Sequence, residues 1–316
     1  MDIRQVIPRD AIPSIDEPEF GSEYQGSPGE SVLVLEANPA RAYPVSILNY
    51  HEVVNDVVDG EPTAVTWCPL CGSAVVYDRR VEGRTLTFGV SGKLADDDLV
   101  LYDRETNSEW KQSSGKCLSG PLAGRELTVK PATMITEGDF RAQYPEGLLL
   151  QPPGTESEAA GDGPEPERPN YDQDPYREYE RAEGFGIEVH RGVGEGRDWT
   201  RDDLDPKAVV LGLELAEAAK GYPLGWVRDV GGVVQDTLGD RAVLVVAGAS
   251  GIHAYEDPGY DWSIVAGQLE ADGTTWGTHT GASEDGRTLS RLPARRLFAF
   301  AWQDDHGPEA FWRPTE

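Results

Sequence analysis

A set of short sequence matches, repeated in the same order in the two halves of the chain, constrains the fold more than any other feature. Segment 40–45 (ARAYPV) is similar to 219–224 (AKGYPL), and an apolar, strand-like stretch precedes each. Further matching segments follow in the same order: 53–56 with 233–236, 108–110 with 274–276, and 124–127 with 286–289. Because chance matches would not keep their order, the sequence predicts two copies of one structural unit.

The composition between the two copies predicts where each copy ends. Prolines, glycines and carboxylates dominate residues 152–169, so this stretch cannot bury a core of its own. Aromatic residues return after it. We therefore predict a first repeat over 1–150, an acidic Pro/Gly-rich linker over 151–170, an ordered bridge over 171–206, and a degenerate second repeat over 207–316.

Short apolar runs bounded by Gly, Asp or Pro predict a mainly β protein with a few short helices. Each repeat is expected to be a β-barrel-like or sandwich-like unit. A hairpin turn is predicted at 82–84 and helices at 46–54 and 137–143. Strands are predicted at 32–35, 64–67, 73–77, 85–90, 99–102 and 185–190.

The charge of the chain limits its partners. It has 56 acidic and 28 basic residues, a formal net charge of -28, and few lysines. This acidic composition is typical of adaptation to a salt-rich, halophilic cytoplasm, and it argues against binding to nucleic acid or to an anionic membrane. No apolar run reaches the roughly 18 residues that a membrane span needs, and the N-terminus lacks a signal-peptide pattern. We expect a soluble, cytoplasmic protein.

The cysteines point to a site. The chain has 3 cysteines, and Cys68 and Cys71 stand two residues apart in the sequence TWCPLCG. This spacing suits a soft metal ion or a dithiol pair. The aligned positions of the second copy hold Ala247 and Ser250, and His51 has no counterpart there. Only the first copy is therefore expected to carry the chemistry.

His51 is the imidazole nearest to this motif in the sequence. On the predicted helix, His51 and Asn55 are one turn apart. The sequence HEVVN starts like a zinc-protease helix, but Asn55 is a poor zinc ligand, so we reject that interpretation. Asn55 or Asp56 would instead orient the ring of His51.

Three interpretations of the motif remain open. In the first, His51, Cys68 and Cys71 bind Zn or Cu, with His190 and Cys117 as further candidate ligands. In the second, the protein is a thiol-dependent oxidoreductase or transferase: Cys68 is the nucleophile, His51 its base and Cys71 the resolving thiol. In the third, the cysteines only pack, within a non-catalytic module that binds an unknown small molecule.

Other polar residues are candidates for the lining of a pocket near the thiols. Ser91, Asp103, Arg104 and Trp110 are the candidates. The run Asp96-Asp97-Asp98 lacks the spacing of a calcium loop, and we interpret it as a solvated turn.

Long motifs in the first copy identify a family. The stretches LNYHEVVND (48–56), VTWCPLCG (65–72), LTFGVSG (86–92) and YDRET (102–106) closely resemble the family called domain of unknown function 3179. The resemblance is continuous over about 11–145 and looser afterwards. It implies that the region of His51, Cys68 and Cys71 is the signature site of the family, but it implies no reaction. Cys117 falls where relatives are expected to have a small residue.

Overall fold

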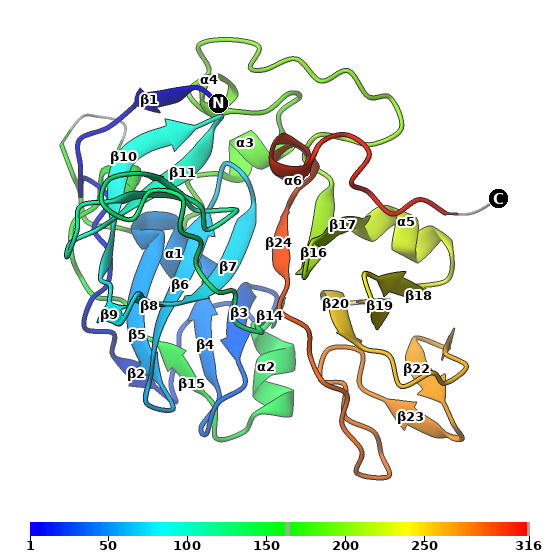
Figure 1. The fold of residues 1–316 in the computed structure, drawn as a ribbon. Helices are drawn as coiled ribbons and strands as arrows, with labels where there is room; N and C mark the ends of the chain where they lie inside the picture. The colour runs from blue at the N-terminus through cyan, green and yellow to red at the C-terminus, as the bar shows by residue number, and fades with distance from the viewer. Residues whose placement is uncertain (162–164, 315–316) are drawn as a thin grey trace.

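The computed structural model describes residues 1–161 and 165–314, and the prediction of a mainly β protein is confirmed (Figure 1). The helices of the described residues are short, and four of them directly follow a strand. They are α1 (Val45–His51), α2 (Glu137–Gln143), the 3-10 helix η1 (Glu158–Ala160), α3 (Arg177–Arg181), α4 (Ile187–His190), α5 (Leu224–Asp229) and α6 (Ala299–His306).

Two five-stranded sheets are built from the first half of the chain. In one sheet the strand order is β1-β10-β11-β12-β13, and in the other β14-β3-β4-β15-β2. The strands of the first sheet are β1 (Ile3–Gln5), β10 (Phe88–Ala95), β11 (Asp98–Asp103), β12 (Glu109–Lys111) and β13 (Cys117–Ser119). Those of the second are β2 (Phe20–Gly21), β3 (Ser31–Leu35), β4 (Arg41–Pro44), β14 (Thr133–Thr136) and β15 (Leu148–Leu150).

A six-stranded sheet joins the two halves of the chain. Its order is β17-β16-β24-β7-β6-β5, so β24 from near the C-terminus lies beside β7 from the first half (Figure 1). The pairing between these two strands is short, with Arg296 opposite Ala74. The strands are β5 (Val53–Val58), β6 (Glu61–Cys68), β7 (Ser73–Asp78), β16 (Val209–Leu215), β17 (Ala218–Pro223) and β24 (Arg295–Phe298).

Smaller sheets complete the described part. Two have three strands each, β18-β19-β20 and β21-β22-β23, and lie in the second half; one is the hairpin β8-β9. Their strands are β18 (Val233–Leu238), β19 (Arg241–Gly248), β20 (Gly251–Glu256), β21 (Ser263–Val265), β22 (Gln268–Ala271), β23 (Thr274–Trp276), β8 (Arg80–Val81) and β9 (Arg84–Thr85).

The largest hydrophobic cluster surrounds the cysteine motif. Cys68 and Cys71 are part of it, together with residues of β10, β11 and α6 such as Leu99 and Trp302. Burial of this much apolar surface is the main force holding the first half against α6 and β24. The motif therefore sits in the core and not on the surface.

Elements recur in the same order in the two halves. The series β3-β4-α1-β5-β6-β7 has the same order of strands and helix as β16-β17-α5-β18-β19-β20. Tyr43 donates a hydrogen bond to Asp56 (2.6 Å), and Tyr222 donates one to Asp236 (2.9 Å). These likenesses agree with a duplication, which remains a prediction, as does the division into two units.

Some local predictions are confirmed and others are wrong. The helix at 137–143 is present as α2, with Thr136 accepting a hydrogen bond from the backbone N–H of Asp139, and Glu82 and Gly83 form the turn of the β8–β9 hairpin. The predicted helix 46–54 instead ends at His51, because Glu52 adopts a left-handed conformation (φ 56°) and β5 begins at Val53. His51 and Asn55 are therefore not one helical turn apart.

Two predicted strands also differ. The strand predicted at 85–90 is interrupted, since β9 ends at Thr85 and β10 begins at Phe88. The segment 185–190 contains α4 and not a strand; Gly186, at φ 96°, precedes the helix, and Phe185 stacks on Phe300. Of the predicted linker, residues 162–164 lie outside the described part. Its residues 157–160 contact the first half: the backbone N–H of Glu158 donates to Ala11.

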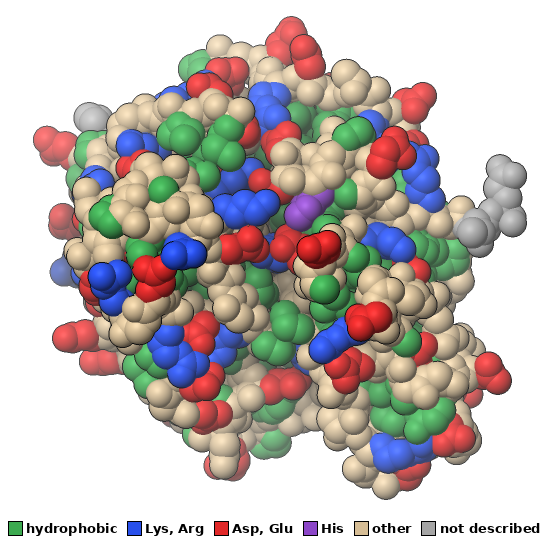
Figure 2. Space-filling view, in the orientation of Figure 1, with side chains coloured by type: hydrophobic (Ala, Val, Ile, Leu, Met, Phe, Trp, Pro, Cys, Tyr) green, Lys and Arg blue, Asp and Glu red, His purple; other side chains and the backbone are tan. Residues whose placement is uncertain are grey.

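Acidic side chains are spread over the face shown in Figure 2, with arginines and lysines among them. No helix in the described ranges is both long and apolar enough to cross a bilayer.

Candidate functional site

A tight turn between two antiparallel strands brings Cys68 and Cys71 together. Cys68 is the last residue of β6 and pairs with Ser73, the first residue of β7. The backbone N–H of Gly72 donates to the carbonyl of Pro69 (3.3 Å), and Gly72 has a φ of 52°, which favours glycine. A Cβ at Gly72 would lie 2.6 Å from the ring of Phe298. The shape of the turn thus depends on the absence of a side chain there.

Asp98 joins the two cysteines. One ligand atom from each of Cys68, Cys71 and Asp98 lies within 4.8 Å of the others, and all three residues are buried. Oδ2 of Asp98 accepts a hydrogen bond from the backbone N–H of Ser113 (3.1 Å), whereas Oδ1 is buried and has no hydrogen-bond partner among the described residues. A buried carboxylate oxygen without a partner is costly unless a further group binds it.

A buried lysine, Lys111, lies close to Asp98. Lys111 Nζ is 3.9 Å from Asp98 Oδ2 and donates a 2.6 Å hydrogen bond to Asp305 of α6. Asp305 also accepts a hydrogen bond from the hydroxyl of Ser113 (2.8 Å). Burial disfavours the charged form of Lys111, but the carboxylates of Asp98 and Asp305 outweigh it and raise the lysine pKa. A helix of the second half thus supports a site of the first.

Burial controls the protonation of the cluster. It raises the pKa of Asp98 to about 6, although Lys111 opposes the shift. It also raises the pKa of Cys71 well above its usual value, with further contributions from Cys68 and Asp98. In the absence of a bound cation, Cys71 is therefore a neutral thiol at neutral pH.

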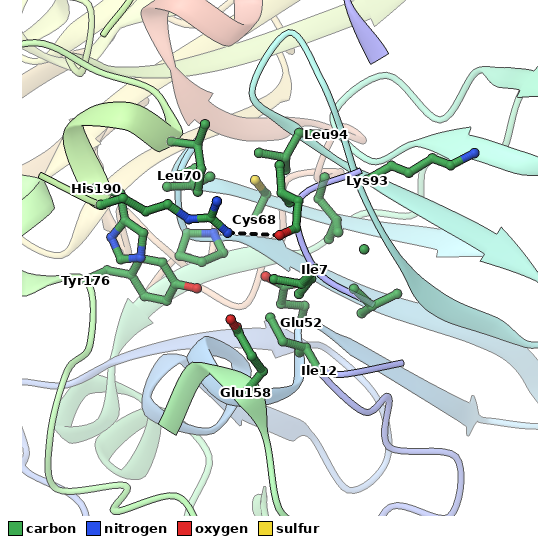
Figure 3. A pocket seen from close by; sticks show the side chains of 17 residues that line it. Ile7, Ile12, Glu52, Cys68, Leu70, Lys93, Leu94, Glu158, Tyr176 and His190 are labelled. Atoms are coloured by element: carbon green, nitrogen blue, oxygen red, sulfur yellow. Dashed lines mark hydrogen bonds between the residues drawn. The ribbon is translucent and has the colours of Figure 1, made fainter. Parts of the chain in front are cut away.

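A cavity of about 90 Å³ lies next to Cys68 (Figure 3). It is larger than the roughly 10–15 Å³ that a single water needs. Glu52, Glu158, Tyr176 and His190 face the same space, Lys93 and Arg191 also line it, and the rest of the wall is mostly apolar. The apolar lining is formed by Val6, Ile7, Ile12, Pro69, Leu70, Val90, Leu94, Leu99 and Ile187.

Glu52 is the least expected residue of this cavity. Glu52 directly follows α1, and its left-handed backbone conformation ends the helix. The side chain is buried, and Oε2 has no hydrogen-bond partner in the described part of the chain. Burial, together with the nearby carboxyl of Glu158, raises the pKa of Glu52 to about 8. The group therefore holds a proton at neutral pH.

His51, predicted as a ligand, is not in the group of Cys68, Cys71 and Asp98. Its Nδ1 is 3.0 Å from the carbonyl oxygen of Pro13, and its Nε2 is 2.8 Å from the hydroxyl of Tyr171. Both ring nitrogens thus have partners. Burial lowers the pKa of His51 to about 4, so the ring is neutral.

Asn55 and Asp56, predicted to orient that ring, have other partners. Asn55 exchanges hydrogen bonds with the backbone of Phe88 and donates one to Asp16. Asp56 accepts hydrogen bonds from Arg41 and Tyr43. Both belong to β5, which begins after the turn at Glu52. The prediction that either residue holds His51 is not supported by these contacts.

His190 and Cys117, the other candidate ligands, lie elsewhere. His190 lines the cavity with Cys68 and stacks on Tyr176 (ring centroids 4.7 Å apart), but it is not in the three-residue group. Cys117 is in β13, and its thiol contacts the carbonyl of Ser119 at 3.3 Å. Neither residue is brought together with both Cys68 and Cys71.

The predicted pocket residues do not line the cavity. The hydroxyl of Ser91 donates to the carbonyl of Val100, and Asp103 accepts hydrogen bonds from Thr106 and from Trp110 Nε1. Arg104 is exposed and pairs with Asp16. These contacts link β10 to β11 and Arg104 to the segment around Asp16, and none of the four residues lines the cavity beside Cys68.

Asp98, Lys111 and Glu52 were missed by sequence reasoning. Asp98 belongs to a run interpreted as a solvated turn, yet only Asp96 and Asp97 form the turn, with φ of 52° and 65°, and Asp98 already starts β11. The continuous apolar run directly after Asp98, Leu99 to Tyr102, could have signalled that Asp98 begins a buried strand.

Comparison with known proteins identifies the family. No curated protein and no solved structure matches the chain. The chain does match the family described as protein of unknown function (DUF3179) over residues 9–310, nearly its whole length. The chain therefore belongs to the DUF3179 family, as its motifs predict.

Proposed function

We propose that the protein binds one thiophilic divalent cation, zinc, through Cys68, Cys71 and Asp98. The observation that carries the proposal is the buried Oδ1 of Asp98, which has no partner among the described residues and belongs to a carboxylate grouped with two thiols within 4.8 Å. A cation would satisfy this oxygen. Sulfur and carboxylate donors converging at this spacing are what a tetrahedral zinc site needs.

The charge of the buried group also supports the proposal. Without an ion, Cys71 is a protonated thiol, and the charges are those of Asp98, Lys111 and Asp305. A divalent cation that binds two thiols displaces one proton from each of them. Two positive charges leave with the protons, and two enter with the cation. Binding therefore leaves the net charge of the buried group unchanged, which avoids the cost of burying a new charge.

The set of donor atoms favours zinc over copper. Two thiolates alone would suit Cu(I), but the carboxylate of Asp98 is a hard ligand that zinc accepts more readily. Three protein ligands leave one tetrahedral position free, as in catalytic zinc sites. The cavity beside Cys68 can supply a water or a small ligand for that position.

Glu52 is suited to exchange a proton with such a ligand. Its carboxyl lines the same cavity as Cys68 and has a free oxygen. Because its pKa is about 8, Glu52 is protonated near neutral pH and can donate a proton there. Once it is ionised, at slightly higher pH, it can accept one. The site is thus suited to a small ligand that binds in a mostly apolar cavity, whose wall also carries Lys93, Glu158 and Arg191.

Elemental analysis of the purified protein tests the proposal. We expect about one equivalent of zinc per chain in the wild type, and less than about a tenth in a C68S/C71S variant. C117S is the matched control, because it removes a third buried thiol that lies outside the group, and it should keep its zinc. Wild-type protein that retains no zinc, even after zinc is added and unbound metal removed, would refute the proposal.

A dithiol–disulfide pair is the second candidate. The sulfurs of Cys68 and Cys71 are close, and only Cys68 lines the cavity, so an oxidant would reach Cys68 first and Cys71 would resolve it. The raised pKa of Cys71 disfavours its thiolate and weakens this alternative. This alternative would be favoured if mild peroxide rapidly lowered the mass of the metal-free wild type by two hydrogen atoms, as disulfide formation does, and if the protein bound no zinc.

A further inference from the structure

A second cavity, of about 200 Å³, lies where the two halves of the chain meet. Its walls come from β3 and β14 of the first half and from β16, β20 and β24 of the second. It is distinct from the cavity beside Cys68, since the two have no lining residue in common. The inference drawn from it does not depend on zinc binding, although Arg296 also contacts Gly72 of the cysteine turn.

The lining of this cavity is cationic in a strongly acidic protein. Arg228 and Arg296 line it, and none of its described lining residues is an aspartate or glutamate, although the chain has 56 of them. Among the described residues, neither arginine has a carboxylate within ion-pair distance. The lining thus offers positive charge, although the carboxylate of Asp139 lies just behind it as the hydrogen-bond acceptor of Ser250.

Arg296 is held in place by contacts that leave its charge uncompensated. Its guanidinium lies 5.8 Å from the centre of the Trp67 ring and 5.7 Å from that of Phe298, and Nη1 donates to the carbonyl of Gly72. Burial lowers the pKa of Arg296 to about 10, and the charge of Glu180 only partly opposes this. A partly buried guanidinium whose direct contacts are neutral can bind an anion.

The rest of the lining is mostly apolar and therefore favours a ligand with an apolar body. Leu33, Met134, Val209, Leu211, Leu224 and Ile252 line the cavity. Two of the three lining hydroxyls are engaged, since Thr133 contacts His253 and Ser250 donates to Asp139, which leaves that of the exposed Ser31. A phosphate would find few donors here, whereas a planar carboxylate can bind one guanidinium with both oxygens.

We propose that this cavity binds a small carboxylate with an apolar body, with Arg296 as the principal anchor and Arg228 at the edge. A cavity of about 150 Å³ accommodates benzene, so the volume here suits a molecule of the size of benzoate. The ligand class is therefore an aromatic or branched short-chain carboxylic acid in its anionic form.

Isothermal titration of benzoate into the full chain at fixed salt tests the proposal. We expect saturable binding of benzoate, and much weaker binding of benzamide, which has nearly the same shape but no charge, and of inorganic phosphate. R296Q should weaken benzoate binding roughly tenfold or more, because it removes a charged hydrogen-bonding partner. R241Q, which removes an exposed arginine outside the cavity, should not.

A cavity-filling variant provides a test that leaves both arginines intact. Ala294 lines the cavity, and A294L should reduce benzoate binding while the unliganded protein still unfolds cooperatively. Absence of benzoate binding to wild type, equal binding of benzamide, tighter binding of phosphate, or unchanged binding to a folded R296Q would each overturn the proposal.

Discussion

Lys111 donates a 2.6 Å hydrogen bond to Asp305, which lies 194 residues further along the chain, and both side chains are buried. The pair ties α6 to the strands that carry the cysteine site. It also leaves Lys111 close enough to Asp98 (3.9 Å) to balance its charge. The C-terminal helix is therefore part of the structural support of the site.

Removing Lys111 should destabilise the protein strongly. K111M leaves Asp98 and Asp305 buried without their cation, which we expect to cost about 3–5 kcal/mol in free energy of unfolding. K93M is the matched control, since Lys93 pairs with Glu109 at the same 2.6 Å but is partly exposed, and it should cost about 1 kcal/mol or less. Urea unfolding measures both; equal losses would contradict the account.

Glu52 should make the metal-free protein less stable as pH rises. Its pKa is about 8 in the folded state and near 4.5 when unfolded, so the folded state holds an extra proton between these values. Stability should fall across this window, by up to roughly 5 kcal/mol from Glu52 alone. E52Q should have a shallower slope, which Asp98 still provides below about pH 6, whereas E217Q, at an exposed position, should keep the full slope. Parallel pH profiles for wild type and E52Q would contradict the assignment.

His51 should affect acid stability and not zinc binding. Its pKa is about 4 in the folded state against 6.5 in the free side chain, so the unfolded state binds the extra proton in between. Stability should fall as pH drops through this window, by up to about 3 kcal/mol. H51Q should be less sensitive to acid and should keep its zinc. Loss of zinc in a folded H51Q would restore the interpretation of His51 as a ligand.

Gly72 should be more sensitive to substitution than Gly60, a glycine of positive φ with no neighbour near its Cβ position. G72A adds backbone strain of about 1–2 kcal/mol and a clash with Phe298, for a further 1–3 kcal/mol. In G60A the strain is similar, but a Cβ would meet nothing within 4 Å. The difference between the two variants in thermal or urea unfolding isolates the clash. G72A should also bind zinc more weakly, because the turn holds both thiols.

Local patterns predict much of this fold, and contacts distant in sequence account for most of what they miss. The helix at 137–143, which Thr136 caps, and the turn at Glu82–Gly83 are local features, and the helix and the turn were both predicted correctly. The end of α1 was missed because Glu52 adopts a left-handed conformation that its side chain does not favour. The apolar stretch at 185–190 fits strand or helix, and packing against Phe300 accompanies the helix.

Only part of the site could be predicted from the sequence, again because the rest depends on contacts between distant residues. Cys68 and Cys71 are two residues apart and were found at once. Their proximity to Asp98 depends on how β11 packs beside the β6–β7 turn, which no sequence spacing encodes. His51 was chosen for its imidazole, but Pro13 and Tyr171 occupy both of its nitrogens.

Zinc K-edge X-ray absorption on the zinc-loaded full chain tests the central claim most directly. We predict two sulfur ligands at about 2.3 Å and the remaining ligands as oxygens at about 2.0–2.2 Å, without the multiple-scattering signal of imidazole. D98N should shift the oxygen shell and weaken zinc binding. A spectrum with fewer than two sulfurs, or with a histidine signal, would contradict a site made of Cys68, Cys71 and Asp98.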